Sequence, residues 1–356
     1  MDKKGLSLRL LLTIGIVMLI NGVVLTEYGQ TASQKPIILR YSDYGPPGRA
    51  VMEAVVKWAE EIEKRTNGNV KVEFHYNGAL ATAREVPEAM KAGAFEMALS
   101  VADYYPAKAP FDKVFSLPFM MGGTAYEFGE KWTRVLFDYY ELPPVKKQWE
   151  VFGCMALLPQ PVPPYELLTV KPIRSIEEIP GLRINARGFY GKVLSNMGAT
   201  VLSMPPTEIY MAMQKGILDG FLAAPTTALG YRVYEVGKGY LRVPFGGMGC
   251  NGLITLDAWK KLGSENQRIL LEVRDKMLPK FTAEINGASE TKALEVMKKA
   301  GVEIVNISPK ILLSLTEKYG KPIWEECVKE EMTKSKLPFK EVFDAVLKAK
   351  EKYGAP

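Results

Sequence analysis

Histidine is almost missing from this 356-residue chain, which contains only His75. Catalytic triads and most zinc sites need histidine or paired cysteines, and the chain has no Cys-x-x-Cys pair, no Gly-x-Ser-x-Gly elbow and no P-loop. His75 falls on the outward side of an alternating strand over residues 70–75, which favours a solvated imidazole over a catalytic base. We therefore expect no enzymatic activity, no cofactor and no metal site.

Cysteine is also scarce, with three widely spaced residues at Cys154, Cys250 and Cys327. An odd number of cysteines in an exported protein leaves at least one free thiol. One disulfide stays open as an alternative, but buried free thiols are the favoured interpretation.

Long apolar runs are confined to residues 10–25, which is short of the roughly 20 residues that a membrane-spanning helix needs. Two lysines and an arginine precede this run, and the small residues 31–33 follow it. This order is typical of a cleavable signal peptide, so residues 1–33 are predicted to direct export to the periplasm. An uncleaved N-terminal anchor is the alternative.

Neither sign of charge is in large excess, since 46 Lys and Arg face 40 Asp and Glu for a net charge of +6. The basic residues are interleaved with acidic ones, which is typical of solvated helix faces and argues against a nucleic-acid partner. At this length a single hydrophobic core rarely serves the whole chain, so two lobes are expected.

Hydrophobic periodicity predicts a β-α-β-α-β unit over residues 37–101, with a mainly parallel sheet. Six prolines between residues 143 and 164 are too dense for a helix and fit an extended crossing between lobes. The glycine-rich residues 246–255 fit a second crossing, and two crossings make a hinge. An apolar stripe that begins at Leu270, with a kink near Pro279, predicts a long helix able to lie across both lobes.

These segments give a two-lobed α/β fold class. Residues 34–157 are assigned to lobe I, residues 158–248 to lobe II, and residues 249–300 to the return into lobe I and the spanning helix. Residues 301–356 are expected to form C-terminal helices that pack on lobe II.

Residues 181–220 predict a strand-helix-strand-helix unit. Leu182, Ile184 and Ala186 alternate with Arg183, Asn185 and Arg187, as in a strand with one apolar face, and the stripe of a short helix follows up to Gly198. A second helix follows Pro205 and Pro206, with Thr207 as its expected N-cap. Ligands of open α/β sheets bind beyond the carboxyl ends of strands and face helix N-termini. Arg187 stands at such a point and suits a carboxylate.

Other strand ends supply the hydroxyl, amide and aromatic groups that small-molecule pockets need. Asn185 and Arg187 end one strand, and Ser100 ends another. The predicted ligand-binding residues are Tyr44, Ser100, Asp103, Tyr104, Asn185, Arg187, Tyr190, Pro225, Thr226 and Asn251.

One motif favours a nucleotide instead, because residues 247–252 match Gly-x-Gly-x-x-Gly. That fingerprint requires a strand before it and a helix after it. Here a proline stands in the preceding segment and the following residues look like a strand, so a flexible crossing is favoured over a dinucleotide-dependent enzyme.

Six segments, taken as a set, resemble the solute-binding proteins of tripartite ATP-independent periplasmic (TRAP) transporters. They are residues 44–48, 93–98, 115–119, 181–184, 197–210 and 214–220, in the same order as in that family. The resemblance spans residues 37 to 330. It implies a periplasmic-binding-protein fold that closes on a small organic acid and delivers the acid to a permease with one large and one small membrane subunit.

The chain departs from the family pattern at the arginine that clamps the ligand carboxylate. The resemblance puts that arginine at the position of Asn185, whereas Arg187 lies two positions further along the strand. Either Arg187 supplies the clamp from a shifted position, or the ligand is held by amide hydrogen bonds. An extracytoplasmic sensor that keeps its N-terminal anchor is the alternative to a transport role.

Overall fold

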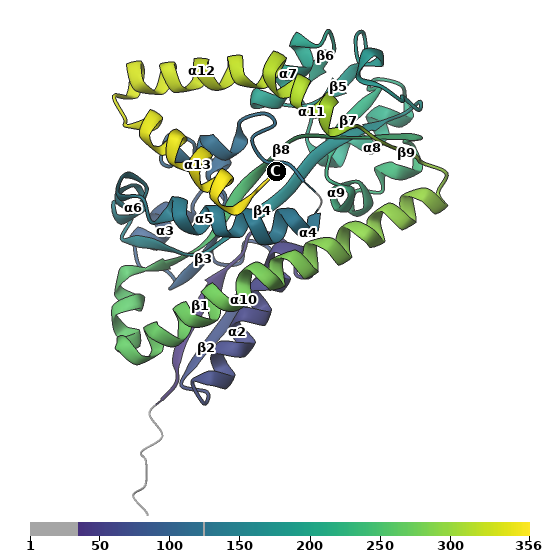
Figure 1. Ribbon diagram of the computed structural model, residues 1–356. Helices are drawn as coiled ribbons and strands as arrows, with labels where there is room; N and C mark the ends of the chain where they lie inside the picture. The colour runs from purple at the N-terminus through teal and green to yellow at the C-terminus, as the bar shows by residue number, and fades with distance from the viewer. Residues whose placement is uncertain (1–34, 124) are drawn as a thin grey trace, which may run out of the picture. The chain divides into compact units, whose positions relative to one another are not determined.

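The computed structural model describes residues 35–123 and 125–356 (Figure 1). The predicted signal peptide, residues 1–33, lies outside the described residues. Residues 38–356 form one compact unit, and the following description concerns that unit.

The first elements alternate between strand and helix as the periodicity predicts. They are β1 (Ile37–Ser42), α2 (Ala50–Arg65), β2 (Val70–His75), α3 (Val86–Lys91) and β3 (Met97–Ser100). β1 and β3 are parallel neighbours, with Tyr41 opposite Met97. α2 buries an apolar stripe that includes Val55, Trp58 and Ile62, and the Trp58 indole donates to the Leu270 carbonyl at 3.4 Å.

Two long strands cross between the halves of the fold. β4 (Cys154–Thr169) and β8 (Gly239–Thr255) pair antiparallel from Cys154 opposite Thr255 to Thr169 opposite Gly239. The register shifts three times along this ladder, including twice between Val162 and Leu167. Both crossings are extended, as the proline and glycine content predicts.

Pro143 and Pro144 correct one part of that prediction, because they begin α6 (Pro143–Glu150) rather than an extended segment. The first turn of a helix tolerates proline, since its N–H groups have no intrahelical partner to lose.

The sheet as a whole is mixed, and the parallel pairing predicted within residues 37–101 is present between β1 and β3. Its order is β2-β1-β3-β8-β4-β7-β5-β6, and β9 (Glu303–Asn306) is a further parallel neighbour of β8. β8 is antiparallel to β3 and β4, and β4 is antiparallel to β7. Each half keeps its own parallel pairs, and the antiparallel ones arise because the chain crosses the fold once in each direction.

The second half repeats short strands and helices. They are β5 (Arg183–Asn185), α7 (Gly188–Asn196), β6 (Thr200–Leu202), α8 (Pro206–Gln214), β7 (Gly220–Ala223) and α9 (Pro225–Gly230). β5 is shorter than expected, because Arg187 is already the N-cap residue of α7. The N-cap of α8 is Pro205 and not the predicted Thr207.

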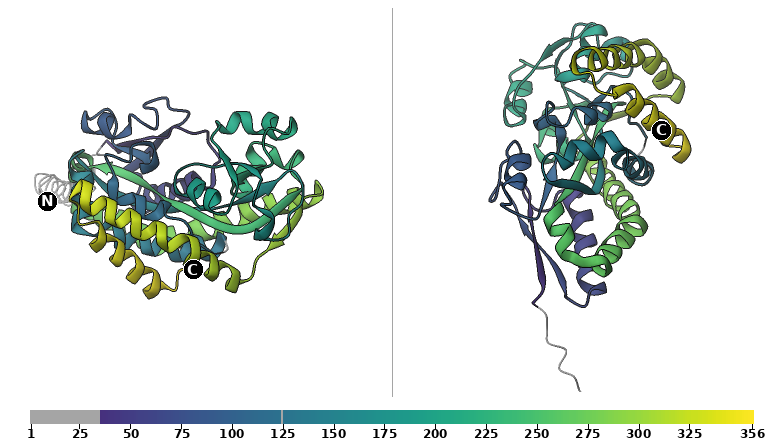
Figure 2. Two further views of the ribbon diagram at one scale, coloured as in Figure 1. Left: turned by 90° about the horizontal axis from the view of Figure 1, so that it is seen from above. Right: turned by 90° about the vertical axis from the view of Figure 1, so that its left-hand side faces the viewer.

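The predicted long helix is α10 (Leu256–Lys299), which runs beside α2 (Figures 1 and 2) and on towards β9 (Figure 1). Its backbone leaves the helical region at Gly263 (φ 71°, ψ 162°), so two helices join there. Pro279 lies inside the second of them.

An ion triad braces α10 against the two crossing strands. Arg242 of β8 donates through Nε to both oxygens of Glu166 in β4 at 3.1 Å, and through Nη2 to Glu290 of α10. The three side chains are only 20%, 7% and 13% exposed for Arg242, Glu166 and Glu290. The triad therefore joins three elements that are far apart in sequence.

The C-terminal elements divide between the two halves. They are α11 (Pro309–Leu315), η6 (Thr316–Gly320), α12 (Lys321–Glu330), η7 (Glu331–Ser335) and α13 (Phe339–Tyr353). Leu315 packs in a cluster with residues of α7, such as Val193. α13, which we expected on lobe II, instead packs against α5 in lobe I, where Phe339 stacks on Phe111 with ring centroids 6.3 Å apart.

Short helical segments complete the fold. They are η1 (Ala102–Tyr104), η2 (Pro110–Ser116), α4 (Ala125–Glu127), η3 (Phe128–Trp132), α5 (Thr133–Tyr140), η4 (Ile176–Glu178) and η5 (Val233–Glu235).

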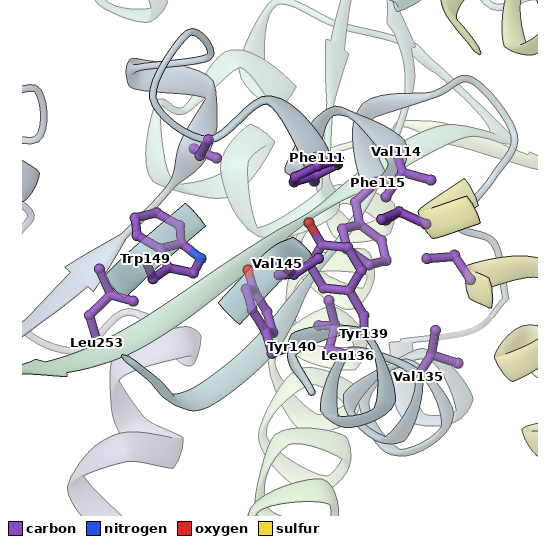
Figure 3. Close-up of a cluster of buried hydrophobic side chains, with 14 of the residues drawn as sticks. Phe111, Val114, Phe115, Val135, Leu136, Tyr139, Tyr140, Val145, Trp149 and Leu253 are labelled. Atoms are coloured by element: carbon purple, nitrogen blue, oxygen red, sulfur yellow. The ribbon is translucent and has the colours of Figure 1, made fainter. Parts of the chain in front are cut away.

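One apolar cluster gathers side chains from η2, α5 and α6, and a buried carboxylate lies beside it. Figure 3 shows its aromatic part, with Phe115 and Tyr139 edge to face at 4.6 Å between ring centroids. Asp112 accepts from the hydroxyl of Tyr139, from the hydroxyl of Tyr140 at 3.3 Å and from the Gln148 amide at 3.3 Å. Burial raises the pKa of Asp112 to about 6.

The three cysteines are free and buried, as the sequence interpretation favours.

Candidate functional site

A cavity of about 490 Å³ is enclosed by side chains from both halves of the fold and from the crossing strands. The lining residues come from η1, η2 and the segment between them, from the crossing strands β4 and β8, and from β5, α7, β7, α9 and the segment after β6. Its lining residues are Asp103, Pro106, Lys113, Ser116, Tyr165, Asn185, Ala186, Arg187, Gly188, Phe189, Tyr190, Ser203, Met204, Phe221, Leu222, Thr227, Tyr231 and Met248.

Arg187 lies at the N-terminus of α7, and its side chain lines this cavity. Its extended backbone (φ −150°, ψ 169°) makes it the N-cap residue, and its side chain does not cap the helix. Over residues 35–123 and 125–356, no hydrogen bond or ion pair engages its guanidinium group. The first N–H groups of α7 have no intrahelical acceptor, and the positive end of the helix dipole favours a negative charge beside them. The guanidinium is thus available to an anionic group in the cavity.

Asn185 lies at the end of β5 and is 8% exposed. Its side-chain oxygen accepts from the backbone N–H of Met204 at 2.8 Å, which ties β5 to the segment after β6. Asn185 therefore has a structural hydrogen bond as well as a place in the cavity lining.

Asp103 faces the same space from η1. One carboxylate oxygen accepts from the Ser116 hydroxyl at 2.9 Å. Surrounding protein raises the pKa of Asp103, and its hydrogen bond with Ser116 and the positive charge of Arg187 partly offset that rise. Although the two charges influence each other, no ion pair joins Asp103 to Arg187 within the described part of the chain.

Aromatic side chains form much of the cavity wall. The rings of Tyr165 and Tyr190 meet at 5.9 Å between centroids and 68° between planes. The Tyr190 hydroxyl donates to the Gly247 carbonyl at 2.5 Å, and burial raises the pKa of both tyrosines. A Cβ at Gly246 (φ 146°) would come within 2.7 Å of the Tyr190 ring, so this strand position needs glycine.

Lys113 is the other cation of the lining, and it already has a partner. Its ammonium group is paired with Glu331 of η7, whose side chain is 8% exposed. This pair links the cavity wall to the C-terminal helices.

Four of the predicted site residues line the cavity: Asp103, Asn185, Arg187 and Tyr190. Tyr44 and Tyr104 lie outside the lining and pack edge to face at 5.4 Å, with Arg49 over the Tyr44 ring. Pro225 begins α9 and Thr226 follows it, whereas the lining residue of that helix is Thr227.

Ser100 and Asn251 face each other across β3 and β8, buried away from the cavity lining. The Ser100 hydroxyl is hydrogen-bonded to Tyr105 at 2.6 Å. Both polar atoms of the Asn251 amide are enclosed without a hydrogen-bond partner in the described part of the protein.

Tyr165 and Met248 were missed by sequence reasoning, although they come from the two segments predicted to cross between lobes. Their place on the crossing segments could have identified them, since a ligand between two lobes must contact the strands that join the lobes. No feature of the sequence around Phe221 or Tyr231 indicated that these residues would line the cavity.

The structure agrees with one interpretation of the sequence and corrects another. Residues 247–252 lie in the interior of the crossing strand β8, as the favoured interpretation expects, and not in a turn between a strand and a helix as a dinucleotide fingerprint requires. His75 is half-buried rather than solvated, and its Nε2 atom is enclosed without a partner among the described residues.

Across residues 35–123 and 125–356, no group of three or more His, Cys, Asp or Glu side chains could hold a metal ion. Over the same ranges, no helix combines the length and the apolar character needed to cross a membrane.

Known proteins match nearly the whole fold. A solute-binding protein of Albidiferax ferrireducens is 24% identical over 84% of this chain and 91% of its own length. A C4-dicarboxylate-binding periplasmic protein of Rhodobacter capsulatus is 27% identical over 76% of this chain and 80% of its own. A TRAP periplasmic solute-binding protein structure from Desulfovibrio salexigens superposes with a TM-score of 0.79 at 21% identity, over 90% of this chain and 98% of that one.

The model of bacterial extracellular solute-binding proteins, family 7, matches residues 41–331. The predicted resemblance to TRAP solute-binding proteins and the predicted two-lobed α/β fold are confirmed by these matches. The chain belongs to family 7 of the bacterial extracellular solute-binding proteins.

Proposed function

We propose that this protein captures a small carboxylate solute in the cavity around Arg187 and delivers it to a TRAP-type membrane permease. The observation that carries the proposal is the Arg187 guanidinium, which reaches a cavity of about 490 Å³ with no internal anion bound to it in the described residues. Arg187 is exposed in this structure, and closure of the two halves over a solute would bury it, so an anionic group of the solute is needed to balance its charge. The R. capsulatus relative, described as binding C4-dicarboxylates, supports the same class.

Asn185 assists this clamp. The family pattern has an arginine at this position, and here the amide oxygen is engaged by the Met204 N–H while its amino group stays available to the ligand. Arg187 thus takes the ionic role from the N-cap of α7, and Asn185 contributes a neutral donor.

Closure of the two halves on the solute is part of the proposal. The lining comes from both halves, so a ligand contacts all of it only when the halves approach, and binding then favours the closed form. The register shifts of the β4–β8 ladder give the crossing strands irregular points at which to bend.

The deciding experiment first identifies the solute by mass spectrometry of the small molecules released when the purified protein is denatured. Calorimetry then measures its affinity for the wild type and for Arg187→Ala. We expect Arg187→Ala to weaken binding by about 30-fold or more, since losing one partner of a desolvated charge pair costs about 2–5 kcal/mol.

Arg183→Ala is the matched control, because Arg183 stands on the same strand but is engaged by Asp219 at 2.8 Å through two nitrogens and lies outside the cavity lining. Equal affinity of Arg187→Ala and the wild type would refute the clamp. Scattering dimensions that stay unchanged on ligand addition would refute closure.

Export is proposed on the N-terminal sequence pattern. We infer that residues 1–33 are removed and that the mature protein is periplasmic, in keeping with an extracellular family. The mass of the protein recovered from the periplasm tests this, and an intact Met1 in membrane-bound material would favour the anchored sensor.

A further inference from the structure

Two opposite charges face the same cavity without neutralising each other. Arg187 reaches it from the N-cap of α7, and Asp103 reaches it from η1. Both side chains line the same cavity, yet no ion pair joins them in the described ranges. A ligand that fills the cavity therefore contacts both Arg187 and Asp103.

The lining carries one further charge, and it is already balanced. Lys113 is paired with Glu331, so Arg187 and Asp103 are the two charges left for a ligand, and they sum to zero. A monocarboxylate would pair with Arg187, and Asp103 would then face the ligand as a second negative charge. A dicarboxylate would place its second anion against Asp103, which is more unfavourable still.

The Asp103 carboxylate can accept further hydrogen bonds. Its Oδ1 atom accepts from the Ser116 hydroxyl, and no hydrogen bond to Oδ2 occurs within residues 35–123 and 125–356. Tyr165 and Tyr190 line the same cavity as Asp103. Aromatic faces beside a carboxylate are a favourable environment for a cation.

We propose that the solute is a zwitterionic acid, with its carboxylate on Arg187 and an ammonium group on Asp103. The proposal rests on the carboxylate site described under the proposed function and adds the second pole of the ligand. A net-neutral solute matches the net-neutral lining, and Arg187 and Asp103, which are both exposed here, each gain a charged partner when the solute binds.

The test compares acids that differ in one group. The first series is 5-aminopentanoate, 5-hydroxypentanoate and glutarate. The second is leucine, 2-hydroxy-4-methylpentanoate and 4-methyl-2-oxopentanoate. Calorimetry on ligand-free wild-type protein should show the amino member of at least one series binding about 30-fold or more tightly than its hydroxy and acidic counterparts.

Asp103→Asn keeps the shape and hydrogen bonding of the side chain and removes its charge. We expect this variant to bind the amino and hydroxy acids within about threefold of each other, while Asp257→Asn, on the exposed start of α10, keeps the wild-type preference. A hydroxy acid or dicarboxylate that binds as tightly as the amino acid, or a preference that survives in Asp103→Asn, overturns the zwitterion. Absence of binding by every acid refutes the proposed carboxylate site itself, so the two failures can be told apart.

Discussion

Replacing Arg242 with methionine would leave two carboxylates where the ion triad now joins β4, β8 and α10. Methionine fills a similar volume, so the change mainly removes charge. Arg242 is 20% exposed, and its partners Glu166 and Glu290 are 7% and 13% exposed, so water cannot fully replace the guanidinium. Removing one member of a buried ion pair typically destabilises a protein by about 3–5 kcal/mol.

The loss should depend on pH in a direction that the triad fixes. Burial already raises the pKa of Glu166, although Arg242 acts to lower it. Without the arginine, the folded-state pKa of Glu166 rises further above the unfolded value. The folded protein then binds a proton more readily than the unfolded one, so the destabilisation is greatest at pH 8 and shrinks as the pH falls through the new pKa.

Urea unfolding followed by tryptophan fluorescence at pH 8 and pH 5 measures both effects. We expect Arg242→Met to lose about 3–5 kcal/mol at pH 8 and clearly less at pH 5, and the double variant with Glu166→Gln to recover more than half of the loss. A loss below about 1 kcal/mol that is the same at both pH values would refute the reasoning, because the triad would then be a solvent-screened surface pair.

Two further predictions concern buried groups. Because the pKa of Asp112 is raised to about 6 from 3.8, the wild type should lose roughly 2 kcal/mol of stability relative to Asp112→Asn as the pH rises from 4 to 7, which parallel urea titrations would detect; parallel curves for the two proteins would contradict this. Burial raises the pKa of Cys154 and Cys250 to about 12 and that of Cys327 to about 11, so a disulfide-exchange reagent at pH 8 should label no thiol in the folded protein and three after denaturation. Rapid labelling of the folded protein would show an exposed thiol.

Local sequence patterns predicted the elements well because each pattern reports which face of a strand or helix is buried. The strand-end rule also brought Asp103, Asn185, Arg187 and Tyr190 to one cavity. The rule names an edge of the sheet but not the direction of a side chain. Ser100, for example, ends a strand, yet it is buried opposite Asn251 and hydrogen-bonded to Tyr105, outside the cavity lining.

Longer-range features could not be predicted from local patterns. Tyr165 and Met248 became lining residues through the pairing of β4 with β8, and periodicity carries no information on which strands pair. The chain turns at Lys336 (φ 54°) before α13, and this turn does not by itself specify which half of the fold α13 covers. In the structure, α13 packs on α5 rather than on lobe II. An amphipathic helix can cover either half equally well, and tertiary packing decides.

The pairing of β8 between β3 and β4 has a consequence for how the chain is made. β3 ends at Ser100, but its neighbour in the sheet, Asn251, is synthesised much later, after the whole second half. The first half therefore cannot complete its sheet while the chain is emerging, and neighbours so distant in sequence form slowly. A nascent chain whose sheet stays incomplete for most of its synthesis keeps the edge of β3 unpaired until β8 has been made.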